Sequence, residues 1–310
     1  MKYLSLMTML LLGLHVGAQG TNFNSQRNWS LNKKEILFGI GATQFLGDLG
    51  GKDKVGTDFS LVDLDWPSTV MGGMIGYRYR FHPYFSTTTS IHFGMLSGDD
   101  AKTQDKARNE RNLSFRSPVV DLSQRLEFIF LAKEKFGARY KVRGLKFTKD
   151  KNFQMYAFGG VGVNYFNPQA QYDGKWVSLR PLRTEGQGLE GGPKQYLPFT
   201  VTMPMGIGVR VGISKMWRLG IEATYVKTFS DYIDDVSGVY YDPALLGSPE
   251  AAFLSNPSTN PANYAPGQQR GDKQKDAYFY LNLVAYKNIT YKSKSKARKK
   301  ETWRGGRYKF

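Results

Sequence analysis

Residues 200–213 read TVTMPMGIGVRVGI, and their odd-numbered and even-numbered positions differ in kind. Side chains along a β-strand point alternately to its two faces, so this segment has one apolar face and one small or polar face. A strand that lies between lipid and a packed barrel interior requires this pattern. The segment is therefore predicted to be a strand of a transmembrane β-barrel. Its apolar face carries Val201, Met203, Met205, Ile207, Val209, Val211 and Ile213.

The same alternation recurs along the chain and brings the total to eight segments. An even count returns a chain that starts in the periplasm to the periplasm, as in single-chain bacterial barrels. We expect an all-β fold, an eight-stranded antiparallel transmembrane β-barrel. A soluble β-sandwich with one wet face is the alternative, because alternation alone does not distinguish lipid from a second sheet. The other segments are residues 36–42, 71–81, 85–95, 118–130, 155–165, 219–225 and 277–291.

The connections between these segments differ in length. Residues 82–84 and 214–216 are short turns, whereas four other connections are long and rich in Gly, Asn, Asp and Pro. Short turns face the periplasm in such barrels and long loops face outward. Residues 133–152 are an exception, because this long connection lies on the periplasmic side. The predicted outer loops are residues 47–68, 97–116, 166–198 and 231–276.

The N-terminus has the features of a secretory signal peptide. Lys2 precedes a short apolar stretch that ends at a small-residue site before Ala18. We expect cleavage after Ala18, a periplasmic lead-in over residues 19–34, the barrel over residues 35–291 and a basic periplasmic tail over residues 292–310. No apolar stretch has the roughly 18–20 residues of a spanning helix, and the chain has no Cys for a disulfide or a thiolate-bound metal.

Charged residues occur at positions of the strands that share parity with the small residues. These charged side chains are therefore expected to point into the barrel. The interior of an eight-stranded barrel is just wide enough for its own side chains to fill. We therefore predict a salt-bridged plug and no channel. The predicted lumen network consists of Arg78, Arg80, Asp121, Arg125, Glu127, Arg210 and Glu222.

No constellation of residues indicates catalysis, a cofactor or a metal centre. The predicted mature chain has two histidines, His82 in a turn and His92, which is predicted to point inward beside Ser90. A hydrogen-bonded lumen histidine is the commoner outcome than the Ser-His pair of an acyl hydrolase. The acidic run at residues 231–235, DYIDD, either binds a hard cation or forms Asx turns. We expect no enzyme, no cofactor and no small-molecule substrate.

The formal charge of +17 is concentrated in two segments. Both belong to the periplasmic side of the predicted topology, where an exported chain meets no nucleic acid, so protein or anionic lipid is the expected partner. A solvated tail is the alternative. The candidate partner-binding residues are Lys133, Lys135, Arg139, Lys141, Arg143, Lys146, Lys292, Lys294, Lys296, Arg298, Lys299, Lys300, Trp303, Arg304 and Arg307.

Three segments carry a resemblance to a known family. Residues 111–118 (RNLSFRSP), 156–162 (YAFGGVG) and 229–238 (FSDYIDDVSG) are similar to the PorG-like outer-membrane barrels of Bacteroidota. The resemblance covers the chain from about Glu35 to Tyr291 and leaves out the tail.

This resemblance implies an accessory of the type IX secretion system, which serves protein secretion and, in gliding species, gliding motility. It implies an outer-membrane location and docking to a periplasmic ring complex made by the PorK lipoprotein and PorN. The basic periplasmic segments would then be the docking surface. A general structural or adhesive barrel, whose outer loops bind surfaces, is the alternative function.

Overall fold

A computed structural model describes residues 33–49, 69–103, 105–133, 140–141, 153–213, 216–272 and 274–289. Eight long strands dominate this part of the chain. Each corresponds to one of the segments in which apolar and polar residues alternate. The strands are β1 (Lys34–Leu46), β2 (Val70–Arg80), β3 (Phe85–Asp99), β4 (Ser114–Lys133), β6 (Phe153–Phe166), β9 (Phe199–Gly212), β10 (Trp217–Thr228) and β11 (Ala277–Asn288).

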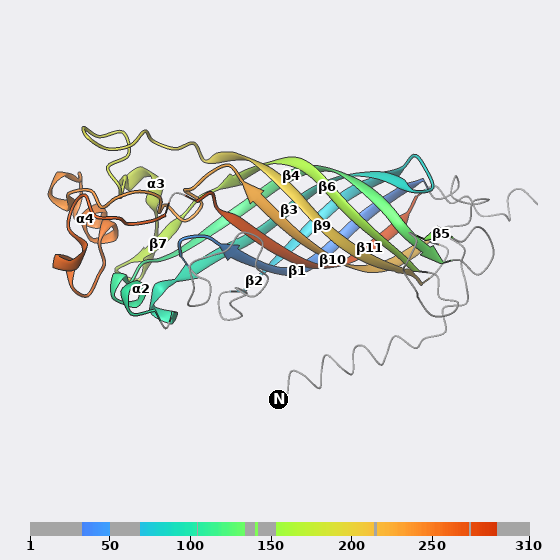
Figure 1. Ribbon diagram of the computed structural model, residues 1–310, viewed down its shortest axis with the longest axis horizontal. Helices are drawn as coiled ribbons and strands as arrows, with labels where there is room; N and C mark the ends of the chain where they lie inside the picture. The colour runs from blue at the N-terminus through green and yellow to red at the C-terminus, as the bar shows by residue number, and fades with distance from the viewer. Residues whose placement is uncertain are drawn as a thin grey trace, which may run out of the picture.

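These strands form a closed antiparallel barrel (Figure 1). The order around it is β1, β2, β3, β4, β6, β9, β10 and β11, and β11 pairs again with β1. In that last pairing Glu35 lies opposite Asn288 and Leu46 lies opposite Ala277. The sheet has no free edge among these strands, which excludes the sandwich alternative and confirms the eight-stranded barrel.

The two ends of the barrel differ. At one end, which we call the turn end, His82 and Phe85 close a tight turn through reciprocal backbone hydrogen bonds of 3.2 Å. Ile213 N–H likewise donates to Trp217 O at 3.0 Å. The opposite end carries the short helices and extra strands, which gather at one side of Figure 1. We call the described residues of 99–113, 167–198 and 229–276 the cap, and this end the cap end.

The cap contains regular elements that the sequence analysis treated as loops. Two short strands form a hairpin, and several helices of one or two turns lie between the barrel strands. They are η5 (Asp100–Lys102), α2 (Lys106–Arg111), β7 (Gln169–Tyr172), β8 (Lys175–Ser178), α3 (Leu179–Leu182), η6 (Pro243–Leu245), α4 (Pro249–Ser255) and η7 (Pro261–Tyr264). At the turn end, β5 (Tyr140–Lys141) pairs with β4.

The exterior of the barrel is apolar. Met71 is 78% exposed, and Ile40, Val161 and Ile207 are each more than 60% exposed. Side chains of this kind destabilise a protein in water but are stabilised by contact with hydrocarbon. An apolar exterior and a polar interior are together the arrangement of a barrel that crosses a membrane. None of the described helices has the length and apolar character needed to cross a membrane.

Strand ends differ from the predicted ones by a few residues. β1 and β10 extend beyond their predicted segments at both ends, and β3 and β4 run on together until Asp99 pairs with Ser114. β4 also has a bulge between Ile129 and Leu131, which shifts its register with β6. The signal peptide, the lead-in up to residue 32, residues 134–139 and 142–152, and the tail lie outside the described residues.

Candidate functional site

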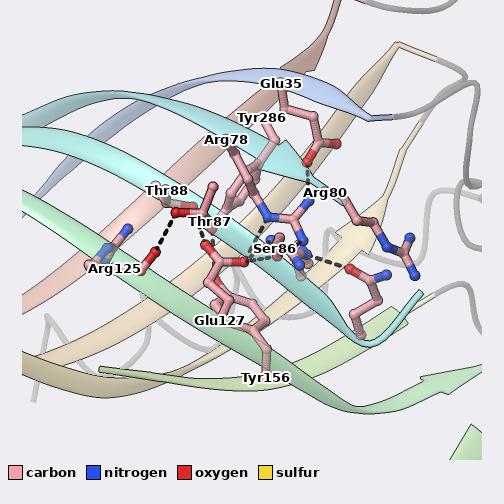
Figure 2. A network of polar contacts seen from close by, with 12 residues as sticks. Glu35, Arg78, Arg80, Ser86, Thr87, Thr88, Arg125, Glu127, Tyr156 and Tyr286 are labelled. Atoms are coloured by element: carbon pink, nitrogen blue, oxygen red, sulfur yellow. Dashed lines mark hydrogen bonds and ion pairs between the residues drawn. The ribbon is translucent and has the colours of Figure 1, made fainter. Parts of the chain in front are cut away.

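The interior of the barrel near the turn end is a network of buried ions centred on Arg78 (Figure 2). Its guanidinium donates from Nη1 to Glu35 Oε2 at 2.6 Å and from Nε to Glu127 Oε2 at 2.7 Å. The third group, Nη2, donates to Ser86 Oγ at 2.5 Å. Ser86 in turn donates to Glu127 Oε2 at 2.9 Å. Arg78, Ser86 and both carboxylates are fully buried, so side chains of four neighbouring strands are joined without contact with solvent.

Two further arginines extend this network across the barrel. Arg210 lies 3.4 Å from Glu127 Oε2 and donates to Gln154 Oε1 at 2.5 Å. Arg218 lies 3.2 Å from Glu35 Oε1 and donates to the same Gln154 oxygen at 3.2 Å. The network therefore connects the side chains of β1, β2, β3, β4, β6, β9 and β10 across the interior of the barrel.

The sequence analysis missed Glu35 and Arg218. Both lie just outside the predicted segments 36–42 and 219–225, whose ends were placed too near the middle of the membrane. The parity signal was present, because Glu35 shares the inward parity of Leu37, and Arg218 shares that of Glu222. Extending each strand by one residue on the same alternation finds both groups.

Glu222 is the centre of a second cluster deeper in the barrel. Its Oε2 lies 3.0 Å from Arg125 Nη1, and its Oε1 accepts from the hydroxyls of Tyr156 at 2.7 Å and Tyr286 at 2.5 Å. The Tyr156 ring also lies under the Arg210 guanidinium at 4.2 Å. Gly208 is required beside it, since a Cβ there would lie 2.2 Å from Tyr156 Cζ.

The remaining predicted lumen residues, Arg80 and Asp121, are buried but make other contacts. Arg80 donates to the carbonyl oxygens of His82 and Pro83 and so ties the turn to β2. Asp121 accepts from Thr202 Oγ1 at 2.9 Å and from the Tyr278 hydroxyl at 3.1 Å. In the described residues, hydroxyl groups are thus the donors that Asp121 contacts, whereas the sequence analysis expected a salt bridge.

His92 lies inside the barrel, as its parity predicted. Its ring stacks on that of Tyr280, with centroids 5.0 Å apart and an interplanar angle of 16°. The Ser90 hydroxyl bonds instead to the Ser123 hydroxyl at 3.2 Å. His92 therefore packs against an aromatic ring, while the nearby serine hydrogen-bonds across to β4.

The cap end is closed by an apolar cluster. Ile233 and Val236, from the acidic run and the residue after it, are at most 1% exposed. They pack with apolar side chains from the ends of the barrel strands, so the connection 229–276 folds into the mouth of the barrel. The cluster consists of Phe45, Leu49, Leu96, Leu113, Phe115, Val119, Phe166, Tyr196, Val226, Ile233, Val236, Tyr278 and Tyr280.

A buried ion pair between Arg270 and Glu185 connects segments of the cap. Arg270 lies 3.0 Å from Glu185 Oε1 and donates to the carbonyl oxygens of Asp235 at 2.7 Å and Ser255 at 3.2 Å. Glu185 also accepts from Ser237 N–H at 2.9 Å. One guanidinium therefore holds together three cap segments that are distant in sequence.

The acidic run bonds to the protein itself. Asp234 Oδ1 accepts from Val236 N–H at 3.0 Å, which is the Asx-turn arrangement. Asp235 accepts from the Thr184 and Tyr196 hydroxyls, and Asp231 accepts from Ser237 Oγ at 2.6 Å. Across the described residues, no group of three or more acidic or histidine side chains is arranged to hold a metal ion.

Several carboxyls of the cap, and Asp48 beside it, have pKa values above the usual range. Burial raises the pKa of Asp231 and of Asp235 to about 6 each. Burial, with repulsion from Asp272, raises the pKa of Asp48 to about 8. The pKa values of Asp234 and Asp276 are also raised, first by burial and then by neighbouring carboxylates. The cap thus contains a set of acids whose protonation favours the folded arrangement.

The hairpin of β7 and β8 has a sequence signal that the analysis did not use. Asp173 and Gly174 both have positive φ, 47° and 73°, between strands that pair Tyr172 with Lys175. An Asp-Gly pair in a two-residue loop is the preferred sequence for a type I′ turn. Arg116 stacks on Trp176 of this hairpin at 3.9 Å and so attaches it to β4.

The candidate partner-binding residues cannot be placed in the same way. The side chains of Lys133 and Lys141 lie outside what the structure describes, and so do the other residues of that set. Only their attachment points are defined. β4 ends at Lys133, β6 begins at Phe153 and β11 ends at Asn288, all at the turn end of the barrel.

Residues 23–241 match a family described as “Domain of unknown function (DUF6089)”. No curated protein sequence matches the chain. Similar solved structures include Neisserial surface protein A, with 6% identity, TM-score 0.40 and coverage of 83% of this chain and 97% of that chain. The attachment invasion locus protein Ail of Yersinia pestis has 9% identity, TM-score 0.34 and coverage of 82% and 98%. OprG from Pseudomonas aeruginosa has 12% identity, TM-score 0.33 and coverage of 82% and 95%.

Proposed function

This chain belongs to the family described as “Domain of unknown function (DUF6089)”, and from this premise we propose that it anchors a periplasmic assembly in the outer membrane. The assembly is the type IX secretion machinery of Bacteroidota, and the partner is a ring of the PorK and PorN type. The barrel itself is neither a channel nor an enzyme. The signal peptide over residues 1–18 directs export, and both termini lie in the periplasm.

The observation that carries this proposal is the closed interior. Arg78, Glu127, Arg210 and Glu222 fill the barrel with fully buried ion pairs, and the apolar cluster closes its cap end. A buried ion pair is held by desolvated contacts that a passing solute would have to break. The interior therefore favours a static barrel whose interactions with other molecules occur at its ends.

The ends of the strands support the choice of the periplasmic face. β4 ends, β6 begins and β11 ends at the turn end, which is where the two basic segments, residues 133–152 and 292–310, are attached to the barrel. Short turns face the periplasm in bacterial barrels. A rigid barrel with two basic attachments on its periplasmic face suits electrostatic docking to a membrane-attached ring.

The test is co-purification from membranes in mild detergent, with identification of the proteins retained. We expect the wild-type chain to recover large periplasmic partners. Deleting residues 292–310, or replacing the lysines of residues 133–151 by Gln, should reduce recovery several-fold. The matched control replaces Lys175 and Lys194, which lie in the cap, by Gln. Equal recovery by the wild-type chain and both periplasmic variants would exclude these segments as the docking surface.

The second candidate function is surface adhesion through the cap. Leu245 is 63% exposed, Phe253 is 52% exposed and Val239 is 50% exposed, all on the connection 229–276. Exposed apolar side chains on a folded outer surface are typical of contact sites. Replacing Leu245 and Phe253 by Ser should lower cell adhesion while secretion continues. Unchanged adhesion would count against the adhesive function and would leave anchoring as the remaining candidate.

A further inference from the structure

Two lysines lie on the lipid-facing side of the barrel at its turn end. Lys34 begins β1 and Lys287 is the penultimate residue of β11, and both are exposed. Each has the outward parity of its strand, shared with Ile36 and Phe38 on β1 and with Leu283 on β11. Both lysines therefore lie on the outer face of the barrel, at the turn-end edge of its apolar band.

The strand register brings the two lysines together. Lys287 lies directly opposite Ile36, and Ile289 N–H donates to Lys34 O at 3.0 Å. Lys34 and Lys287 are thus diagonal neighbours on one face, a relationship that separates residues by about 7–8 Å. Two flexible lysine side chains at this spacing can both reach one phosphate group.

Aromatic rings flank this pair. Trp217 lies opposite Lys287, with Lys287 Nζ 5.6 Å from the ring centroid. Tyr79 lies opposite Lys34 on β2. Tryptophan and tyrosine concentrate at the level of lipid headgroups, because their rings combine an apolar body with a polar group. The rings place both lysines at headgroup depth.

Two carboxylates of the described strands at this end point into the barrel. Glu35 follows Lys34 on β1 and lies opposite Asn288, the residue after Lys287. It is fully buried and pairs with Arg78 and Arg218 inside the barrel. Glu127 is also buried in the lumen. Lys34 and Lys287 are exposed on the outer face, beside aromatic and aliphatic side chains. A lipid matches this surface, since its phosphate meets the lysines while its acyl chains lie along Ile36 and Phe38.

We propose that Lys34 and Lys287, flanked by Trp217 and Tyr79, bind the phosphate of an anionic glycerophospholipid of the phosphatidylglycerol class in the inner leaflet. This inference rests on the proposed outer-membrane location. The two positive charges select an anionic headgroup over a zwitterionic one, whose own cation would lie next to the lysines. Each lysine contributes about fivefold to this preference.

Trp217 provides a reporter inside the site. The full mature chain, with Trp29, Trp66, Trp176 and Trp303 replaced by Phe, is reconstituted in phosphatidylcholine bilayers with increasing brominated phosphatidylglycerol. The reverse mixture, brominated phosphatidylcholine in phosphatidylglycerol, is measured in parallel. We expect quenching of Trp217 to report about tenfold or greater preference for phosphatidylglycerol. Lys34→Gln with Lys287→Gln should bring the preference close to one.

The control is Lys227→Gln, which removes a lysine at the cap end of β10 and should leave the preference unchanged. Heat-modifiable gel migration identifies the folded barrel in every variant. Quenching by both brominated lipids with no preference would overturn the lipid site while leaving the membrane location intact. Quenching by neither lipid would overturn the site and the membrane location together.

Discussion

Arg78 on β2 and Glu127 on β4 are joined across the interior at 2.7 Å, although β3 lies between their strands. Both side chains are fully buried. The pair cannot form until three strands have closed on each other. It therefore depends on the pairing of β2, β3 and β4, and it lies in the network that fills the interior near the turn end.

Removing Glu127 should destabilise the barrel strongly. In Glu127→Ala, Arg78 and Arg210 stay buried but lose the carboxylate that they contact. Removing one partner of a buried ion pair lowers the free energy of unfolding by about 3–5 kcal/mol. Urea unfolding of the reconstituted barrel, followed by heat-modifiable gel migration, measures the change.

The control for this variant is an exposed ion pair. Asp99 and Lys102 lie 3.5 Å apart with side chains 30% and 51% exposed, so Asp99→Asn should cost less than about 1 kcal/mol. Equal effects of Glu127→Ala and Asp99→Asn would contradict the role assigned to the interior network.

A side chain at Gly208 should displace Tyr156. Gly208→Val puts atoms where the Tyr156 ring lies, and overpacking of this kind costs about 1–3 kcal/mol. Thermal unfolding should show the loss, with a change in tyrosine near-ultraviolet circular dichroism. Gly159→Val is the control, because a Cβ there meets nothing within 4 Å. A silent Gly208→Val would mean that Tyr156 moves freely and does not fix Glu222.

The cap should open as the pH rises. The folded pKa is about 6 for Asp231 and Asp235 and about 8 for Asp48, against about 3.9 in an unfolded chain. A raised carboxyl pKa contributes stability that is fully present below about pH 4 and is lost as the pH rises through 6 to 8. Protection of residues 229–276 against hydrogen exchange, taken relative to the intrinsic exchange rate at each pH, should therefore fall between about pH 4 and 8, by up to about tenfold per pH unit for one titrating carboxyl.

Asp48→Asn tests the origin of that pH dependence. In the wild-type protein Asp48 Oδ2 accepts a hydrogen bond from Asp272 N–H at 3.0 Å. The amide oxygen that this substitution introduces can accept the same bond but carries no titrating charge. The fall in protection between about pH 6 and 8 should shrink in the variant, while protection of the barrel strands relative to the intrinsic rate should be the same in both proteins. An unchanged profile would exclude Asp48 as the titrating group.

Loss of Arg270 should release the cap without unfolding the barrel. Arg270→Ala leaves the Glu185 carboxylate and the Asp235 carbonyl buried without their donor, a local cost of about 3–5 kcal/mol. Limited proteolysis should then cut residues 231–276, while the strands still migrate as a folded barrel. Arg270→Lys keeps the charge and should be cut at an intermediate rate. Resistance of Arg270→Ala to cleavage would show that the apolar cluster alone holds the cap.

Some of this structure could be read directly from the amino-acid order. Alternation over residues 200–213 predicts which side chains face outward, and β9 has that pattern throughout. Arg78, Arg125, Glu127, Arg210 and Glu222 were all assigned to the interior by parity, and all are buried there. These predictions succeed because a strand's side-chain period is local and requires no knowledge of its neighbours.

The hydrogen-bond and ion-pair partners of those interior residues could not be predicted from the sequence. Arg78 bonds with Glu35 and Glu127, which lie 43 and 49 positions away, and the pairing and register of the strands decide which of the buried acids each arginine meets. The cap is similar, since Arg270 and Glu185 are 85 positions apart in irregular segments with no period. The strands and their two faces follow from amino-acid order, because alternation is a property of consecutive residues. The ion pairs and the folded cap follow only from the three-dimensional fold, because both depend on contacts between segments that strand pairing and cap packing bring together.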